Sequence, residues 1–463
     1  MKRIAFFGIP AHGHTNPMLP VAAELVRRGN TVRFYSFREF EEKIKATKAE
    51  FVACDAFLPK LTAQEEAGLK QVSTTEMTIQ DIRITLCMDG FLSEEFASFQ
   101  PDVVYTDSVC FWGKLNALKY QVPMVVSVST FAFNQMSSQY MKNSPKEMAD
   151  MIFGLPKISR ELKKLEPYGY HVKNALSLVQ NDNNTDSVVY TSQRFQPYVQ
   201  SFSGHYAFVG PSVFSEALPE KEKERPLVYI SMGTVINDRP DFFAKCIDGL
   251  KDRNVDVIIS CGNNLDKMRK LPDNIKTYPY VNQLEILAKA DVFITHCGMN
   301  SVSESLYMAT PMVLYPQTGE QCAVARRTAE MGAGVFLQDD SPEGIQKAVE
   351  EILSSAAFSQ NAAKCSADFR SCPGPAGAAE FIENAPHESL GRNVLDAINK
   401  MSGKIQGFYW LIAAAAMCLT GLLIGWNYVW IPGVAAGILS YPTGKALQHR
   451  IYKKMISASN DEK

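Results

Sequence analysis

Residues able to hold a phosphorylated ligand gather between Asp291 and Gln321. Val292 to Thr295 is a short apolar run typical of a buried strand, and the turn His296-Cys297-Gly298 ends it. Asn300 and Ser301 are favourable N-cap residues for a following helix. The glycine of the turn would let a ligand approach the backbone, and the helix would direct its free N–H groups and positive dipole end to that place. The stretch therefore predicts a phosphate site, with side-chain donors from His296, Asn300 and Ser301.

The same stretch continues with acceptors suited to a sugar. Glu304 lies one helical turn on, where its carboxylate could accept hydrogen bonds from ribose hydroxyls. Glu320 and Gln321 follow a second apolar run at 312–314, so they would lie at the same sheet edge and suit a polyhydroxylated ligand. The alternative is a plain strand–helix–strand with a polar turn, and the length of the series favours the ligand site.

A second pair of residues could do acid–base chemistry. His14 follows the apolar run Ile4–Ile9, and Asp107 follows the run Val103–Thr106. Both runs are typical of parallel strands, so His14 and Asp107 would lie on the carboxyl edge of one sheet. An aspartate there could fix the imidazole tautomer and stabilise the imidazolium after it takes a hydroxyl proton. Taken alone, such a pair is more often structural.

Length and composition set the frame for these sites. The 463 residues suffice for two domains, and the formal net charge of −2 implies no polyelectrolyte partner. The ten cysteines show neither C-x-x-C pairs nor metal-ligand spacing, which is typical of reduced residues in a cytosolic protein. Cys297 could be a nucleophile, although a small buried side chain is the simpler interpretation.

The 291–321 stretch resembles the nucleotide-sugar signature of the UDP-glycosyltransferases, the family 1 glycosyltransferases. The family pattern is HCG-x-NS-x-x-E, a P-x-x-x-x-P segment and then an acidic residue with Gln. It is matched by His296-Cys297-Gly298, Asn300-Ser301, Glu304, Pro311-Met312, Pro316 and Glu320-Gln321. The family's G-H-x-x-P turn, whose histidine is the general base, is matched at Gly13–Pro17, and Asp107 matches its partner aspartate. The resemblance covers about residues 1–385 and looks most like the bacterial macrolide and flavonoid glucosyltransferases.

The resemblance also assigns roles along the donor site. His296, Asn300 and Ser301 would hold the diphosphate, Glu304 the ribose, and Glu320 and Gln321 the sugar hydroxyls. A glycine loop would lie against the phosphates, at Ser231, Gly233 and Thr234. The family's W-x-P-Q segment is Tyr280-Val281-Asn282-Gln283 here, so the aromatic ring would stack on uracil, the Val281 backbone would contact its edge, and Gln283 would reach ribose or base. Tyr280 for Trp and Asn282 for Pro are departures that leave the nucleotide preference open.

The implied fold is α/β of the GT-B type, two Rossmann-like doubly wound domains facing each other across a cleft. The expected segments are an acceptor-binding domain at 1–211, a linker at 212–225, a UDP-sugar-binding domain with a closing helix at 226–385, a connector at 386–404, and a basic tail at 445–463. Methionines and aromatics between Leu58 and Phe96 and in 131–175 fit either an adaptable acceptor pocket or ordinary helix packing.

The stretch 405–444 lies outside the resemblance. It holds 40 residues without a charge, with lysines on both sides and Trp426, Tyr428 and Trp430 near its middle. Apolar runs near spanning length, central aromatics and cationic flanks predict a transmembrane or membrane-associated hairpin with both ends cytoplasmic. One tilted span and a soluble apolar hairpin between subunits are the alternatives. The expected location is the cytoplasmic face of the cell membrane.

The expected reaction is inverting, metal-independent transfer of a hexose, with glucose as first choice, from a UDP-sugar to a hydroxyl of a small lipophilic acceptor such as a macrolide or flavonoid. His14 and Asp107 would be catalytic, no cofactor or metal would be needed, and no nucleic acid would bind. A lipid glycosyltransferase acting on diacylglycerol or sterol is the first alternative. A nucleotide-sugar epimerase or phosphorylase, and a non-catalytic sensor, are further alternatives.

Overall fold

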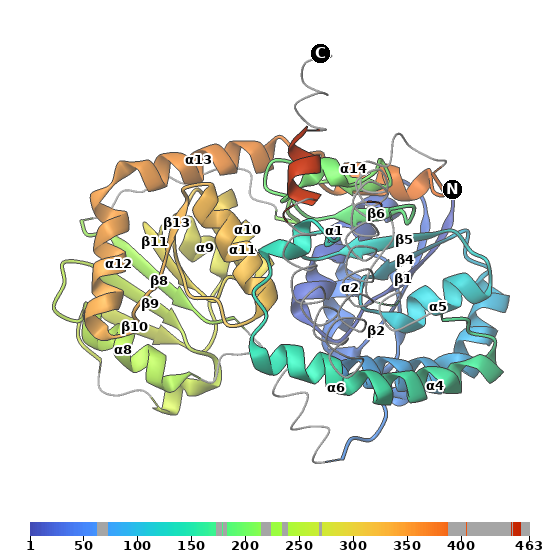
Figure 1. The fold of residues 1–463 in the computed structure, drawn as a ribbon. Coiled ribbons are helices and arrows are strands. Elements are labelled where there is room, and N and C mark those ends of the chain that lie inside the picture. Colours follow the sequence, from blue (N-terminus) through green and yellow to red (C-terminus); the bar gives the residue numbers. More distant parts are fainter. Residues whose placement is uncertain are drawn as a thin grey trace, which may run out of the picture. The chain divides into compact units, whose positions relative to one another are not determined.

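The computed structural model of the protein describes residues 1–62, 73–172, 178, 183–213, 224–233, 239–267, 271–387, 404, 446 and 448–454. One compact unit comprises Met1–Pro197 and Ala207–His387. It contains two sheets whose recorded strand pairs are parallel, and helices cover both (Figure 1). This is the GT-B arrangement that the sequence predicts.

The first sheet has seven strands in the order β3-β2-β1-β4-β5-β6-β7. Its strands are β1 Arg3–Phe7, β2 Thr31–Ser36, β3 Glu50–Ala53, β4 Val103–Asp107, β5 Met124–Val128, β6 Ser187–Val189 and β7 Tyr206–Phe208. The chain reverses direction across the sheet between β1 and β4, and such a switch point is where parallel sheets bind ligands at their carboxyl ends.

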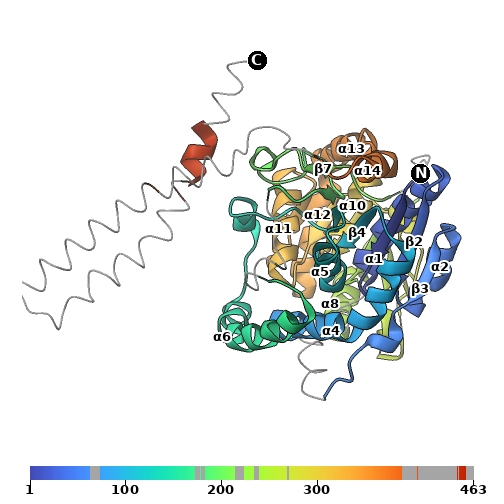
Figure 2. The same ribbon diagram turned by 90° about the vertical axis from the view of Figure 1, so that its right-hand side faces the viewer.

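Helices of the first half flank this sheet. They are α1 His12–Arg27, α2 Glu41–Ala46, α4 Thr74–Phe99, α5 Phe111–Lys119 and α6 Pro145–Leu162. The two long helices α4 and α6 lie side by side in both views of the ribbon (Figures 1 and 2). Neither helix has a clear helical period in the sequence, because residues 58–96 and 131–175 mix apolar and polar side chains.

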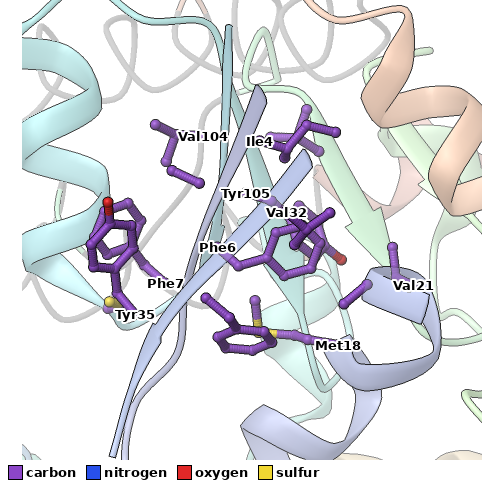
Figure 3. Packing of buried hydrophobic residues seen from close by; sticks show 14 of the residues in the cluster. Ile4, Phe6, Phe7, Met18, Val21, Val32, Tyr35, Val104 and Tyr105 are labelled. Carbon is purple, nitrogen blue, oxygen red and sulfur yellow. The ribbon is translucent and has the colours of Figure 1, made fainter. Parts of the chain in front are cut away.

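Successive residues of β1 point to opposite faces of the first sheet, and both faces are covered (Figure 3). Phe7 stacks on Tyr35 with ring centroids 4.6 Å apart, while Phe6 faces the side of Met18 and Val21 on α1. Burial on both faces explains why the parallel strands are continuous apolar runs.

The second sheet has six strands in the order β10-β9-β8-β11-β12-β13. They are β8 Leu227–Ser231, β9 Asp256–Ser260, β10 Ile275–Tyr278, β11 Val292–Thr295, β12 Met312–Leu314 and β13 Gly334–Phe336. The helices are α8 Pro240–Leu250, α9 Gln283–Leu287, α10 Met299–Tyr307, α11 Gly319–Glu330 and α12 Pro342–Ser354. Its switch point lies between β8 and β11, the positions that correspond to β1 and β4.

Two further helices carry the chain back to the first sheet (Figure 1). They are α13 Ala356–Arg370 and α14 Gly374–Glu383. Glu383 accepts hydrogen bonds from Arg28 (3.0 Å) and from Asn30 (2.6 Å), which follow α1 in the chain. The end of the second half is thereby fixed to the first half.

The first helix corrects one expectation. The sequence predicts a turn over Pro10–Asn16 and a helix from Pro17, because proline is favoured at the start of a helix. In the structure, α1 begins at His12 and contains Pro17 inside it. A proline has no N–H to donate to the carbonyl four residues earlier, here that of Gly13. Asn300 Nδ2 donates to this Gly13 carbonyl at 3.0 Å, so the helix tolerates the proline.

The second compact unit comprises Tyr198–Tyr206 and Glu388–Lys463. Tyr452 donates to Gln200 Oε1 at 2.7 Å, and the Tyr198 hydroxyl lies 3.1 Å from His449 Nδ1. In the portion of the chain described, no helix has both the length and the apolar character needed to cross a bilayer. The hairpin expected at 405–444, and residues 214–223 of the expected linker, lie outside the described residues.

Candidate active site

His14 lies in the first turn of α1, next to the end of β4. Its Nδ1 is 2.9 Å from Asp107 Oδ2 and 3.1 Å from the hydroxyl of Ser129, which directly follows β5. The Asp107 side chain is fully buried, and its other oxygen accepts the N–H of Val109 at 2.9 Å. The His14 side chain is 31% exposed. The structure thus brings together the two residues that the sequence predicts as catalytic.

The carboxylate sets the state of the imidazole. Burial alone would lower the pKa of His14, but the charge and hydrogen bond of Asp107 raise it to about 8, with smaller contributions from Glu320 and Asp81. Because an ionised Asp107 can only accept, Nδ1 carries the hydrogen. Nε2 is then the ring atom that can take a proton, as a general base requires.

Glu320 approaches this histidine from the second half of the unit. It is exposed in the first turn of α11 and close enough to raise the pKa of His14. Its neighbour Gln321 accepts the N–H of Gln317 at 2.8 Å, which tightens the turn before α11. The residue predicted to bind the sugar therefore lies within electrostatic range of the residue predicted to act as base.

A second histidine lies at the switch point of the second sheet. His296 follows β11, and two glycines leave the space for its ring. A Cβ at Gly233 would be 2.5 Å from ring atoms of His296, and a Cβ at Gly298 would be 2.7 Å from its Nε2. Gly233 also has φ +76°, a conformation that favours glycine. Ser231, at the end of β8, uses its hydroxyl to accept the N–H of Gly233 at 3.3 Å.

The pKa of His296 is shifted in the opposite direction from that of His14. Burial lowers its pKa to about 4, against a smaller opposing effect of the Ser231 backbone. The ring is therefore neutral at pH 7. Within the described residues, its Nδ1 is buried and has no hydrogen-bond partner. A neutral ring carries a single N–H, so it can donate at most one hydrogen bond, and it does so without adding charge.

The helix after this turn begins at Met299, and its N-cap is Gly298. The expectation that Asn300 and Ser301 would cap the helix is wrong. Cys297 takes φ +67° and Gly298 is extended, so the chain turns into the helix two residues earlier than expected. Asn300 and Ser301 instead lie in the first turn, where backbone N–H groups have no intrahelical partner.

Glu304, one turn along α10, is tied to the segment after β10. Gln283 Nε2 donates to Glu304 Oε2 at 2.7 Å and lies 3.4 Å from the Ser301 hydroxyl, while the Tyr229 hydroxyl donates to Gln283 Oε1 at 3.1 Å. Burial raises the pKa of Glu304, and Gln283 opposes that shift. Three residues predicted to bind the donor thus form one hydrogen-bonded group.

The remaining predicted donor residues lie around this group. Tyr280 is 81% exposed, so its ring face is open to a stacking partner. Val281 is partly buried against the core of the second sheet. Thr234 lies outside the described residues.

The bond from Asn300 to Gly13 joins the two histidine sites. A cavity of about 40 Å³ beside it is lined by Asn16, Pro17, Tyr190, Pro211, Ser212, Val213, Asn300, Ser303 and Glu304. A larger hollow of about 530 Å³ lies between α1 and α14 and is lined by none of the predicted site residues. We assign function to the histidine sites, because that is where the chemically competent groups converge.

Comparison with known proteins identifies the family. The chain is 32% identical over 372 residues to NDP-glycosyltransferase YjiC of Bacillus licheniformis, which covers 76% of this chain and 89% of that protein. The chain belongs to the UDP-glycosyltransferase family. As a family 1 glycosyltransferase, it moves a sugar from a nucleotide sugar to a small-molecule acceptor.

Further comparisons agree with this membership. Residues 244–384 of the glycosyltransferase match the family model "Erythromycin biosynthesis protein CIII-like, C-terminal domain". An uncharacterized UDP-glucosyltransferase, YojK of Bacillus subtilis, is 29% identical over 83% of this chain and 98% of its own length. The crystal structure of the calicheamicin glycosyltransferase CalG4 superposes with a TM-score of 0.67 at 25% identity, covering 84% of this chain and all of that one.

Two residues near the base of the glycosyltransferase escaped sequence reasoning. Asp107 ends β4, and Ser129 directly follows β5. Because the carboxyl ends of parallel strands share one sheet edge, the sequence could have placed Ser129 near His14. Asp81 lies within α4, and its charge adds to the raised pKa of His14. Burial, and then the charge of Asp107, raise the pKa of Asp81 itself, while His14 opposes that shift. No strand or turn signal marks Asp81, since helix packing alone brings it there.

Proposed function

We propose that this glycosyltransferase transfers glucose from UDP-glucose to a hydroxyl of a small lipophilic acceptor, such as a macrolide or flavonoid, with inversion and without a metal ion. The observation that carries the proposal is the pairing of His14 Nδ1 with the buried Asp107, which leaves Nε2 as the proton acceptor beside Glu320.

The reaction follows from these groups. The acceptor hydroxyl gives its proton to Nε2 of His14 while its oxygen forms a bond to the anomeric carbon. The bond from that carbon to the diphosphate breaks on the opposite face, and UDP leaves with the electron pair. One in-line displacement inverts the anomeric configuration. Asp107 stabilises the imidazolium until the proton passes to solvent.

The leaving group is stabilised by preorganised donors. The N-terminus of α10 offers unpaired N–H groups and a positive dipole end, and the neutral His296 can donate a further hydrogen bond. These donors act in place of a divalent cation. Addition of EDTA should therefore leave the rate unchanged.

Two observations bear on the donor. Relatives named as UDP-glucosyltransferases support UDP-glucose, and Glu304 is a half-buried acceptor suited to ribose hydroxyls. Solved neighbours such as the spinosyn rhamnosyltransferase SpnG carry thymidine diphosphate instead. Thymidine lacks the 2′-hydroxyl, so a preference for UDP over thymidine diphosphate should depend on the Glu304 carboxylate.

Relatives named for oleandomycin and for anthocyanidin support a lipophilic acceptor, although the anthocyanidin enzyme matches only 26% of this chain. A lipid acceptor, diacylglycerol or sterol, is the second candidate. Residues 405–444 carry no charge, which favours a membrane-associated hairpin and a location on the cytoplasmic face of the cell membrane.

Product analysis by mass spectrometry tests both candidates. The full chain is given UDP-glucose or dTDP-glucose with a set of phenols, macrolides and diacylglycerol in mixed micelles, with and without EDTA. A glucoside of a phenol or macrolide from UDP-glucose, unaffected by EDTA, is the expected result. Product from diacylglycerol alone would replace the first candidate with the second, and equal use of dTDP-glucose would overturn the donor assignment.

A further inference from the structure

The outer face of α6 is apolar although nothing described covers it. Met148, Ile152 and Leu155 are 53%, 60% and 51% exposed. Their i, i+4, i+7 spacing places them on one face of the helix, where they form an apolar stripe. Phe153 beside them is 80% exposed. Large exposed apolar patches of this kind mark surfaces that contact another phase or another molecule.

The opposite face of α6 is held firmly against α4. Asp150 caps the start of α4, accepting from the Ser73 hydroxyl at 2.9 Å and from the Thr75 N–H at 3.1 Å. Gly154 faces Thr75 so closely that a Cβ there would clash with its side chain. The helix therefore cannot rotate to bury its apolar stripe without breaking this contact.

The charges around the stripe are of one sign. Between residues 142 and 164, the exposed ionisable side chains are all cations: Lys142, Lys146, Lys157, Arg160, Lys163 and Lys164. The acids in this range are half-buried and engaged. Glu147 completes the capping box with Ser144, Asp150 caps α4, and Glu161 accepts from Lys164 at 2.7 Å.

We propose that α6 is a membrane-surface helix. Phe153 and the stripe Met148-Ile152-Leu155 lie in the headgroup boundary of an anionic lipid bilayer, and the cations of α6 bind lipid phosphates. Apolar side chains beside exposed lysines and arginines are the pattern by which helices lie in the plane of such a surface. This surface is formed by described residues of α6 and does not depend on which acceptor the enzyme uses.

The charges argue against a second copy of the chain as the occupant. A two-fold contact pairs a patch with itself, so the cations of one copy would meet those of the other. No exposed acid between residues 142 and 164 could neutralise them. An anionic lipid surface satisfies both the apolar stripe and the cations.

A depth-sensitive probe on α6 tests the proposal in the full chain. Phe153→Trp is mixed with vesicles of phosphatidylglycerol and phosphatidylcholine that carry brominated acyl chains, and its emission is taken as the difference from the wild type. The matched control is Leu118→Trp, at a 61% exposed position of α5. We expect a blue shift and bromine quenching at position 153 and neither at 118. Absence of quenching at 153, or equal quenching at both positions, overturns the proposal.

The cations are tested separately. Lys146→Gln, Lys157→Gln and Arg160→Gln, combined with Phe153→Trp, should raise the vesicle concentration needed for half-maximal quenching roughly fivefold per cation removed. Vesicles of phosphatidylcholine alone should give little quenching. Equal quenching by neutral vesicles, or a blue shift that follows protein concentration without vesicles, overturns the proposal, and the latter would show a contact between copies.

Discussion

The two histidines of the active site lie at the switch points of their sheets and have opposite properties. Each follows a strand at the switch point of its own parallel sheet: His14 after β1 and His296 after β11. Asp107 and Ser129 contact Nδ1 of His14, and its pKa is about 8. Glycines surround His296, and its pKa is about 4.

The difference shows that surroundings assign the role. An imidazole beside a buried carboxylate can store a proton during the reaction, so His14 fits a base. An imidazole walled by glycine backbone stays neutral and leaves room for a ligand to approach, so His296 fits a donor to phosphate. Sequence motifs name both histidines, but only the contacts separate their chemistry.

Removal of the base should have the largest effect. For His14→Ala we expect kcat to fall roughly 10²–10⁴-fold, because the acceptor hydroxyl loses its general base. The Kd for UDP, measured by calorimetry, should stay near that of the wild type. His296→Ala is the counterpart and should weaken UDP binding. Full turnover by His14→Ala would show that the base is another group.

Filling the space beside His296 should weaken binding of the UDP-sugar without affecting the acid–base pair. For Gly233→Ala we expect the KM for the UDP-sugar to rise roughly tenfold or more, since overpacking costs about 1–3 kcal/mol. The control is Gly29→Ala, which has a similar positive φ of +89° but nothing within 4 Å of its Cβ. An equal effect of both changes would mean that backbone strain, not the ring of His296, is responsible.

Loss of Glu304 should weaken donor binding without touching the acid–base pair. Glu304→Ala removes the acceptor of the Gln283 amide and of the proposed ribose bond, and a charge-assisted hydrogen bond is worth about 1.5–3 kcal/mol. The KM for the UDP-sugar should rise roughly tenfold. The KM for dTDP-glucose should rise less. An unchanged ratio between the two donors would remove the ribose role.

The pH dependence should follow His14 and ignore His296. Because the base must be unprotonated, kcat/KM should rise with pH through about 8, the pKa of His14. Asp107→Asn removes the main cause that raises this pKa, so the midpoint should move down while burial keeps acting. His296→Gln should leave the midpoint in place. A midpoint that follows His296 instead would reverse the two assignments.

The smallest effect is expected at Asp81. Its charge adds to the raised pKa of His14 without contacting the ring. Asp81→Asn should move the midpoint of the pH–rate profile down, by less than Asp107→Asn does. A shift as large as that of Asp107→Asn would place Asp81 among the direct partners of the base.

The strands were predictable because burial on both sheet faces demands continuous apolar runs. The expected runs at 292–295 and 312–314 have the observed bounds. The start of α1 was not predictable, because the local signal of Pro17 points to a helix start. A distant donor, Asn300, satisfies the carbonyl that the proline leaves free.

By itself the sequence determined the order of strands and turns, the two histidines, the signature acids and the family, since these depend on residue type and short-range spacing. Tertiary structure decided which nitrogen of His14 is held, that Glu320 and Asp81 act on it, and that α6 turns an apolar face outward. These features depend on distances between segments far apart in the chain. Only packing sets those distances.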